Sequence, residues 1–328
     1  LRFKRPKEIP LHRPIIMQKR MTGVRLCALA SVFAAAIQGE ATSAGQESFM
    51  QVHHIRSATL VLSIGPHHLL VDPMLSPPGA MPGFKMFGGG RRNNPLVPLP
   101  EGTAALLDKV TGVLITHEHP DHLDAAGIAW IKERKLPVWA SPTDVPSLRQ
   151  KGLDAKELRT GELGLQVEHI PSRHGQGIIG WLMGPVAGFY LSYPGEPSVY
   201  MTSDAVMCDS VLDALSRLRP ELVIAPAGSA NFGVGPSILF SQDELMTLIR
   251  KAPHAVLLNH LEALDHCPTT RQALRARLEK EGLSSRVHIP SDGETVSFVR
   301  KQKTPHPAPG PGLVQVPRLQ KWVSSLLG

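Results

Sequence analysis

Apolar positions along the chain follow two patterns, and both predict short strands. Residues 58–64 and 69–73 alternate apolar with polar or small residues across a Gly-Pro-His-His segment, which predicts an antiparallel hairpin. Residues 187–193 and 198–203 flank the turn-forming segment Pro194–Pro197 and predict a second hairpin. Further short strands are predicted at 113–116, 137–140, 163–170, 222–225 and 255–259.

Helical segments lie between these strands. Ser241 and Glu244 have the spacing of a capping box, which predicts the start of a helix. Thr269 is the predicted cap of a later helix that ends at Glu281 and is closed by Gly282. Two more helices are predicted at 123–134 and 210–218. This mixture of hairpins and strand–helix alternation excludes an all-parallel doubly wound sheet. It predicts an α+β fold in which two mixed sheets pack together with helices outside.

One long segment without regular structure interrupts the pattern at residues 76–100. It is rich in Pro and Gly and contains Phe84, Phe87, Arg91 and Arg92. A loop of this length inside a compact domain is usually functional or disordered. We interpret it either as a lid over a site or as a packed surface loop.

The charge is distributed unevenly and divides the chain into three parts. Residues 1–44 carry a net charge of +6 and residues 299–328 carry +5, so the total of +7 leaves −4 for residues 45–298. We therefore expect an N-terminal extension (1–44), a globular domain (45–298) and a basic Pro/Gly-rich tail (299–328). Because the domain itself is mildly acidic, nucleic acid is not the expected partner.

The N-terminal extension has the features of an export signal. Read from Met17 or Met21, basic residues precede an apolar run at Leu26–Ile37, and small residues follow up to Ala44. The run is too short to span a bilayer, so stable membrane insertion is not expected. We predict export to the periplasm through a signal at about residues 17–44, with a cytoplasmic protein bearing an N-terminal extension as the alternative.

The strongest chemical signal follows the strand predicted at 113–116. His117, His119, Asp121 and His122 fall within six consecutive positions. Imidazole nitrogens and carboxylate oxygens suit Zn²⁺, and four such ligands crowd a single ion but can serve two ions side by side. The alternative is a solvated loop with scattered histidines. The spacing therefore favours a dinuclear metal site.

This string resembles the central motif of the metallo-β-lactamase superfamily, and the resemblance covers roughly residues 52–298. It implies a four-layer αβ/βα sandwich with two metals at one edge between the sheets. It also implies further site residues, each at or just after a predicted strand end. By analogy, one metal is held by His117, His119 and His174, the other by Asp121, His122 and His260, Asp204 bridges them, and Asp72 supports the ligands without binding metal.

Three of these assignments have rivals in the sequence. His169 competes with His174 for the third-motif position, and Asp209 competes with Asp204 for the bridging position. His254 and His266 both compete with His260 for the last ligand. Position after a strand favours His174 and His260, because rigid elements fix ligand geometry. Asp204 is favoured because Asp209 would lie on the following helix.

The resemblance also implies a reaction class. A bridging Asp204 is typical of the members that hydrolyse esters, lactones and phosphodiesters, and His119 in place of glutamate favours zinc, with Mn²⁺ or Fe²⁺ as alternatives. Further stretches are similar to a bacterial branch akin to the L-ascorbate-6-phosphate lactonases and, more distantly, the N-acylphosphatidylethanolamine phospholipase D enzymes. We therefore predict a hydrolase in which a hydroxide between two metals attacks an ester, lactone or phosphoester of a small molecule.

Other roles and rival functions follow from the same reading. Asp121 or His266 is expected to protonate the leaving group, although His266 is equally readable as a structural histidine. Arg91 and Arg92 are candidates for contacts with an anionic substrate. Phe84 and Phe87 would suit an acyl chain, as in a phosphodiesterase or phospholipase D-like lipid hydrolase. A β-lactamase and a non-catalytic metal-binding protein are the remaining alternatives, and the oligomeric state stays open.

Overall fold

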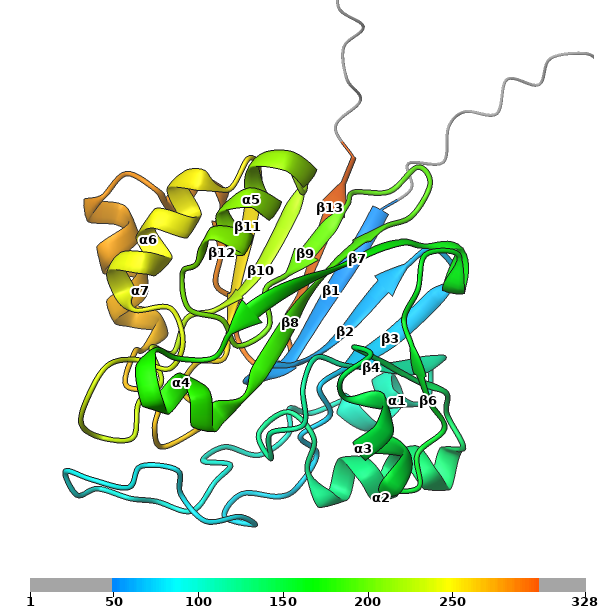
Figure 1. Ribbon diagram of the computed structural model, residues 1–328, viewed down its shortest axis with the longest axis horizontal. Coiled ribbons are helices and arrows are strands. Elements are labelled where there is room, and N and C mark those ends of the chain that lie inside the picture. Colours follow the sequence, from blue (N-terminus) through cyan, green and yellow to red (C-terminus); the bar gives the residue numbers. More distant parts are fainter. Residues whose placement is uncertain (1–48, 301–328) are drawn as a thin grey trace, which may run out of the picture. The chain divides into compact units, whose positions relative to one another are not determined.

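The computed structural model describes residues 49–300, which form two mixed β-sheets with helices outside (Figure 1). The first sheet has seven strands in the order β13-β1-β2-β3-β4-β5-β6. Strands β13, β1, β2 and β3 are antiparallel neighbours, whereas β3 to β6 run parallel. Its strands are β1 (Phe49–Arg56), β2 (Thr59–Ile64), β3 (His67–Val71), β4 (Gly112–Ile115), β5 (Val138–Ala140), β6 (Ala155–Glu157) and β13 (Thr295–Val299).

The second sheet has six strands in the order β12-β11-β10-β9-β8-β7. Strands β7, β8 and β9 are antiparallel neighbours, and β9 to β12 are parallel. Because β8 lies antiparallel between them, β7 and β9 point the same way. The strands are β7 (Gln166–Arg173), β8 (Pro185–Ser192), β9 (Val199–Met201), β10 (Leu222–Pro226), β11 (Ala255–Asn259) and β12 (Val287–His288).

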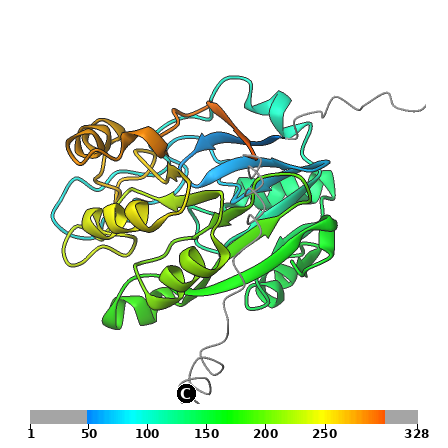
Figure 2. The same ribbon diagram turned by 90° about the horizontal axis from the view of Figure 1, so that it is seen from above.

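The helices cover the outer faces of the two sheets. The first sheet carries α1, α2 and α3, and the second carries α5, α6 and α7, while α4 lies at one end (Figure 1). They are α1 (Thr103–Leu107), α2 (Ala125–Arg134), α3 (Val145–Gln150), α4 (Gly177–Met183), α5 (Asp209–Leu218), α6 (Gln242–Lys251) and α7 (Arg271–Lys280), with 3₁₀ turns at Glu162–Gly164 and Ser284–Arg286. The turned view shows the blue strands of the first sheet beside the green strands of the second (Figure 2).

Three buried clusters fill the spaces between these layers. One lies between the sheets and contains Leu62 from the first and Phe189 from the second. A second joins the second sheet to its helices, with Leu245 of α6 among its members. A third joins the first sheet to α2 and α3 through residues such as Ile131 and Leu148. The layers therefore run helix, sheet, sheet, helix, which confirms the predicted sandwich.

Most predicted elements are present, with one corrected cap. Both hairpins form, as β2–β3 and β8–β9, and Ser241 and Glu244 make the predicted capping box at the start of α6. The cap of α7 is Thr270 and not Thr269, because the Thr270 side chain accepts the hydrogen bond from the backbone of Ala273. The two threonines are neighbours with the same capping chemistry, so the sequence does not separate them.

The terminal predictions fall largely outside the described residues. The export signal at about 17–44 and the tail from residue 301 onward lie there. At the C-terminal boundary, β13 continues to Val299, one residue into the predicted tail. Within residues 49–300, every helix is too short or too polar to cross a membrane.

Candidate metal centre

Strand ends from both sheets converge at one edge of the sandwich. Strands β3 and β4 of the first sheet run parallel, and β7, β9 and β11 of the second also share one direction. Parallel strands end at the same edge of a sheet, so residues that follow them in the sequence meet in space. The chain thereby brings together side chains that are more than a hundred residues apart.

The predicted ligands form two groups. In each group the possible ligand atoms all lie within 4.8 Å of one another. The first group contains His117, His119 and His174, and the second contains Asp121, His122, Asp204 and His260. These are the two sets that the sequence resemblance implies, with Asp204 placed in the second group. All seven side chains are buried except that of His119, which is partly exposed.

Asp204 lies at the centre of both groups. Its Oδ2 atom is 3.1 Å from Nε2 of His122 and 3.5 Å from Nε2 of His260. The same oxygen is 3.6 Å from Nε2 of His174 and 4.0 Å from Nε2 of His117, which belong to the first group. A single carboxylate oxygen thus faces four imidazoles, which is the placement that a bridging ligand requires.

The other ring nitrogen is held by the protein in three of these imidazoles. Nδ1 of His122 lies 2.8 Å from Oδ2 of Asp72, and Nδ1 of His174 lies 2.9 Å from the carbonyl oxygen of Ile238. Nδ1 of His260 lies 3.4 Å from the thiol sulfur of Cys267. These contacts orient each ring and aim Nε2 at the centre, as in metal-binding histidines.

Several of the aimed atoms have no hydrogen-bond partner among the described residues. Nε2 of His117, His122 and His260 are buried in this state. Although Nε2 of His122 is close to Asp204, the pair lacks hydrogen-bond geometry. Buried polar atoms without partners are costly, and metal coordination satisfies them. The donor set of imidazoles and carboxylates therefore fits one or more divalent cations.

The backbone around the site is strained. Asp72, Ser203 and His260 are non-glycine residues with positive φ angles of 49°, 56° and 57°. Each lies just past a strand end: after β3, after β9 and after β11. Such conformations cost of order 1–3 kcal/mol each and cluster at functional sites. Here they turn Asp72 and His260 inward and place Asp204 directly after the turn at Ser203.

The carboxylates and imidazoles shift one another's pKa values strongly. Burial disfavours a charge on His122, but Asp204 and Asp72 outweigh burial and raise the pKa of His122 to about 10. Burial raises the pKa of Asp204, but His122 and His260 outweigh it and hold that pKa well below its ordinary value of 3.8. Burial lowers the pKa of His117 well below 6.5. Asp204 is therefore an ionised candidate ligand, and cationic imidazoles and anionic carboxylates offset each other's charge at this centre.

The rivals considered from the sequence lie elsewhere or play other parts. His169 is on β7, and its Nε2 lies 2.7 Å from the carbonyl oxygen of Leu158, away from the centre. His266 is buried beside the second group, with Nε2 4.0 Å from Oδ2 of Asp121. Asp209 is the first residue of α5 and lies outside both ligand groups.

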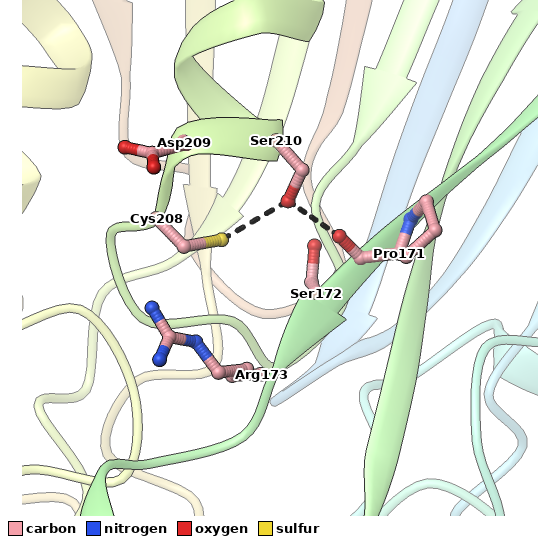
Figure 3. A pocket seen from close by; sticks show the side chains of 6 residues that line it. All are labelled: Pro171, Ser172, Arg173, Cys208, Asp209 and Ser210. Carbon is pink, nitrogen blue, oxygen red and sulfur yellow. Dashed lines mark hydrogen bonds between the residues drawn. The ribbon is translucent and has the colours of Figure 1, made fainter.

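Asp209 instead lines a separate surface pocket of about 270 Å³ (Figure 3). The pocket lies where the end of β7 meets the start of α5, and Arg173 and Cys208 also line it. The hydroxyl group of Ser210 donates to the carbonyl oxygen of Pro171 across it. None of the seven predicted ligands lines this pocket.

The residues predicted to contact substrate all lie on the long loop. Phe84 is partly buried, and its ring centroid is 5.1 Å from that of His266 in an edge-to-face contact. Phe87 is 55% exposed. The Nε atom of Arg91 donates to the carbonyl oxygen of Gly83, so part of this guanidinium holds the loop itself. Arg92 is exposed.

Sequence reasoning missed two residues that support the site. The first is Cys267, whose thiol contacts Nδ1 of His260. Thr116 donates from its backbone N–H and its hydroxyl group to the two oxygens of Asp72, at 2.7 Å each. Thr116 directly precedes the histidine string, and that position was the available signal.

A four-layer sandwich with two groups of His and Asp side chains at one edge, able to bind metal, is the arrangement of a metallo-β-lactamase-type fold. Residues 67–258 match the model of the beta-lactamase superfamily domain, which is more than half of the chain. The chain belongs to the metallo-β-lactamase superfamily.

Several relatives resemble the chain over most of its length. The UPF0173 protein YddR of Bacillus subtilis is 29% identical, covering 76% of this chain and all of YddR. A possible metal-dependent hydrolase from Veillonella parvula has a similar structure, with a TM-score of 0.70, 28% identity and coverage of 76% of this chain and 99% of its own. An isothiocyanate hydrolase from Delia radicum gut bacteria gives a TM-score of 0.71 at 27% identity, covering 76% of this chain and all of its own.

Proposed function

We propose that the protein is a metal-dependent hydrolase with a dinuclear, zinc-preferring centre that cleaves an ester, lactone or phosphoester bond in a small molecule. The observation that carries this proposal is the placement of Asp204, whose Oδ2 atom faces imidazoles of both ligand groups within 4.0 Å. His117, His119 and His174 would hold one cation, and Asp121, His122 and His260 the other. The Veillonella and Delia relatives, both named as hydrolases, support the class.

Two bound cations would supply a hydroxide nucleophile at neutral pH and an electrophile for the developing negative charge. The protein's own contribution is orientation. Asp72, the Ile238 carbonyl group and Cys267 fix the rings of His122, His174 and His260. Because each ring is held through Nδ1, the ligand set is prepared before substrate arrives, which lowers the reorganisation needed during the reaction.

Asp121 and His266 are the candidates for proton transfer. Nε2 of His266 lies 4.0 Å from Oδ2 of Asp121, which belongs to the second ligand group, so His266 lies beside that group. Burial lowers the pKa of His266 to about 4, so this imidazole is neutral near pH 7. We therefore assign His266 and Asp121 the task of accepting a proton from the attacking water and returning it to the leaving group.

The proposal is tested by metal analysis of the purified wild type and of Asp204→Ala, combined with a substrate panel. The panel contains a lactone, a chromogenic ester, a chromogenic phosphodiester, an aromatic isothiocyanate and nitrocefin. We expect about two metals per wild-type chain and turnover of at least one of the first three compounds. Asp204→Ala is expected to lose metal and turnover together, while the exposed Asp213→Ala keeps both.

The panel also separates the rival functions. Turnover of the phosphodiester alone would favour a phosphodiesterase or phospholipase-like enzyme, and turnover of nitrocefin alone would favour a β-lactamase. The isothiocyanate is included because of the similarity to the Delia enzyme. Full metal binding without turnover of any compound in the panel would favour a non-catalytic metal-binding protein and count against the proposal.

A further inference from the structure

The long loop between β3 and α1 is fastened at its tip by one carboxylate. Oδ1 of Asp265 accepts a hydrogen bond from the backbone N–H of Phe84 at 2.8 Å, and Oδ2 accepts one from that of Arg92 at 3.2 Å. The backbone N–H of Lys85 shares both oxygens. Asp265 therefore joins the two arms of the segment 83–94, which we call the anchored loop.

Two residues of the anchored loop, Asn94 and Gly83, fit closely around the carboxylate of Asp265. The side chain of Asn94, which is fully buried, donates to Oδ1 of Asp265 at 3.0 Å and accepts from the backbone N–H of Asp265 at 2.9 Å. At Gly83, a Cβ atom would lie 2.3 Å from Oδ2 of Asp265 and 2.2 Å from the carbonyl oxygen of Arg92. Only glycine allows so close an approach.

A second contact fastens the tip of the anchored loop to the segment after β10. The backbone N–H groups of Met86 and Phe87 both donate to the carbonyl oxygen of Phe232, at 2.9 Å. Gly233 has a φ of +98°, and a Cβ atom there would lie 2.0 Å from the carbonyl oxygen of Phe87. The anchored loop is thus hydrogen-bonded to the rest of the fold at two points, Asp265 and Phe232.

The anchored loop forms an apolar wall beside the metal centre. Phe84 contacts His266, which faces the ligand Asp121. Phe84, Phe232 and two residues of α4, Ile179 and Met183, all pack against one buried cluster that includes Met74, Ile238 and Leu264. Nδ1 of His174 lies 2.9 Å from the carbonyl oxygen of Ile238, which belongs to this cluster, so the wall reaches both ligand groups. The loop, in cyan, and α4 lie at the same end of the sandwich (Figure 1).

The rim of this wall exposes an unusual amount of apolar surface. On α4, Ile178, Trp181 and Leu182 are 79%, 80% and 69% exposed, and on the anchored loop Met86 and Phe87 are 64% and 55% exposed. Isolated exposed apolar residues are normal, whereas a group of them beside a candidate centre marks a binding site.

We propose that Asp265 is a positioning residue that holds the anchored loop against the metal centre, so that Phe84 and the α4 residues Ile179 and Met183 bind the apolar group of the substrate. This inference rests on the proposed hydrolase function and specifies its substrate class. The scissile bond belongs to a molecule with an alkyl or aryl group and not to a wholly polar one. Arg91, whose Nε atom donates to Gly83, stabilises the loop from within.

The anchor is tested without turnover by limited trypsin digestion of the native protein. Lys85, Arg91 and Arg92 place cleavage sites in the anchored loop. Asp265→Asn keeps the side-chain volume but replaces one acceptor oxygen by an NH2 donor. Gly83→Ala leaves the carboxylate intact but prevents the close approach of the Gly83 backbone to Asp265. We expect both variants to be cut at these sites about tenfold faster than the wild type, because the loop opens locally. Asp213→Asn, an exposed aspartate on α5, is the matched control and should behave as the wild type.

The substrate class is tested by steady-state kinetics on p-nitrophenyl acetate and p-nitrophenyl octanoate. For Asp265→Asn and Gly83→Ala we expect KM for the octanoate to rise about tenfold or more, with kcat/KM for the acetate within about twofold of the wild type. A general loss of folding would instead lower activity on both esters, and thermal melting of each variant checks for it. Metal content should match that of the wild type.

Each outcome bears on one part of the inference. Wild-type digestion rates in both variants would overturn the anchor. Equal losses on the two esters, or loss of metal, would overturn the positioning role. If digestion accelerates but no protein turns over either ester or any compound of the substrate panel, the anchor stands and the hydrolase proposal fails. Binding of octanohydroxamate is then compared with that of acetohydroxamate by calorimetry. Tighter binding of the longer compound by the wild type but not by Asp265→Asn supports the apolar wall, and equal binding overturns it.

Discussion

Oδ2 of Asp72 lies 2.8 Å from Nδ1 of His122, and both side chains are buried. Asp72 is in turn fixed by the backbone N–H and the hydroxyl group of Thr116, each at 2.7 Å. The backbone of Asp72 has a φ of +49°, so the chain tolerates strain to direct this carboxylate inward. The strand end of β3 thereby controls which nitrogen of a candidate ligand faces the centre.

Replacing the carboxylate of Asp72 tests directly whether it orients the ring of His122. In Asp72→Asn the amide can no longer accept from both His122 and Thr116, so the ring loses its fixed tautomer and orientation. We expect metal affinity to fall about 10- to 100-fold, as for other residues that support metal ligands. Competition with a chromogenic chelator measures the affinity. Asp213→Asn serves as the control, and an unchanged affinity in Asp72→Asn would contradict a supporting role.

The site was largely predictable because metal-ligand chemistry leaves a local trace. Four of the seven candidate ligands occupy positions 117 to 122, and the others follow predicted strands. The sequence favours Asp204 over Asp209 because Asp209 would lie on the following helix, and the structure does place Asp209 at the start of α5. Where the sequence pattern predicts a strand end, the parallel arrangement of the strands brings the residue that follows to the shared edge of the sheet.

Residues that act through distant contacts left no such trace. The strand β1 was missed because it carries His54 and Arg56, which read as surface residues. Arg56 is fully buried, and its guanidinium donates to the carbonyl oxygens of Met74, Ser76 and Val97. The partners of Asp265 likewise lie more than 170 residues earlier. Tertiary hydrogen bonds that satisfy a buried charge cannot be read from local periodicity.

His54 predicts how stability depends on pH. Burial lowers its pKa below 6.5, and its Nε2 atom accepts a hydrogen bond from Arg271 at 3.3 Å. The folded protein therefore holds this imidazole neutral, whereas the unfolded chain takes up a proton below about pH 6.5. The unfolded state binds more protons, so stability is full above pH 6.5 and is lost as the pH falls below it.

The measurement is urea unfolding between pH 7.5 and 5.5 for the wild type and His54→Gln. One imidazole contributes a slope of up to about 1.4 kcal/mol per pH unit, and the glutamine variant should lack that share. His53→Gln on the same strand is a neighbouring comparison, because burial also lowers the pKa of His53 and its ring contributes a slope of the same sign. Identical pH slopes in wild type and His54→Gln would rule out this titration.

The capping box of α6 predicts a local stability effect. Ser241 accepts from the backbone N–H of Glu244 at 3.3 Å, and Glu244 accepts from that of Ser241 at 2.9 Å. Ser241→Ala removes one half of this pair and is expected to cost about 1 kcal/mol of unfolding free energy. Equilibrium urea unfolding measures it. Ser216→Ala, at an exposed position on α5, should change the unfolding free energy by no more than about a few tenths of a kcal/mol.

Metal removal predicts a loss of stability that metal alone restores. Nε2 of His117, His122 and His260 is buried without a hydrogen-bond partner, and Asp204 is an ionised carboxylate enclosed among four imidazoles. A cation bound to these atoms stabilises the folded state, because the unfolded chain scatters the ligands over 144 positions from His117 to His260. At a free metal concentration of 100 times Kd the gain is about 2.7 kcal/mol per site.

Treatment with a chelator should therefore lower the melting temperature by several degrees, and stoichiometric Zn²⁺ should restore it, with Mn²⁺ and Fe²⁺ compared in parallel. Asp204→Ala should start near the lower temperature and respond little to either treatment. A wild-type melting temperature that is indifferent to chelator and to every added metal would show that these seven side chains do not hold a cation in the folded protein.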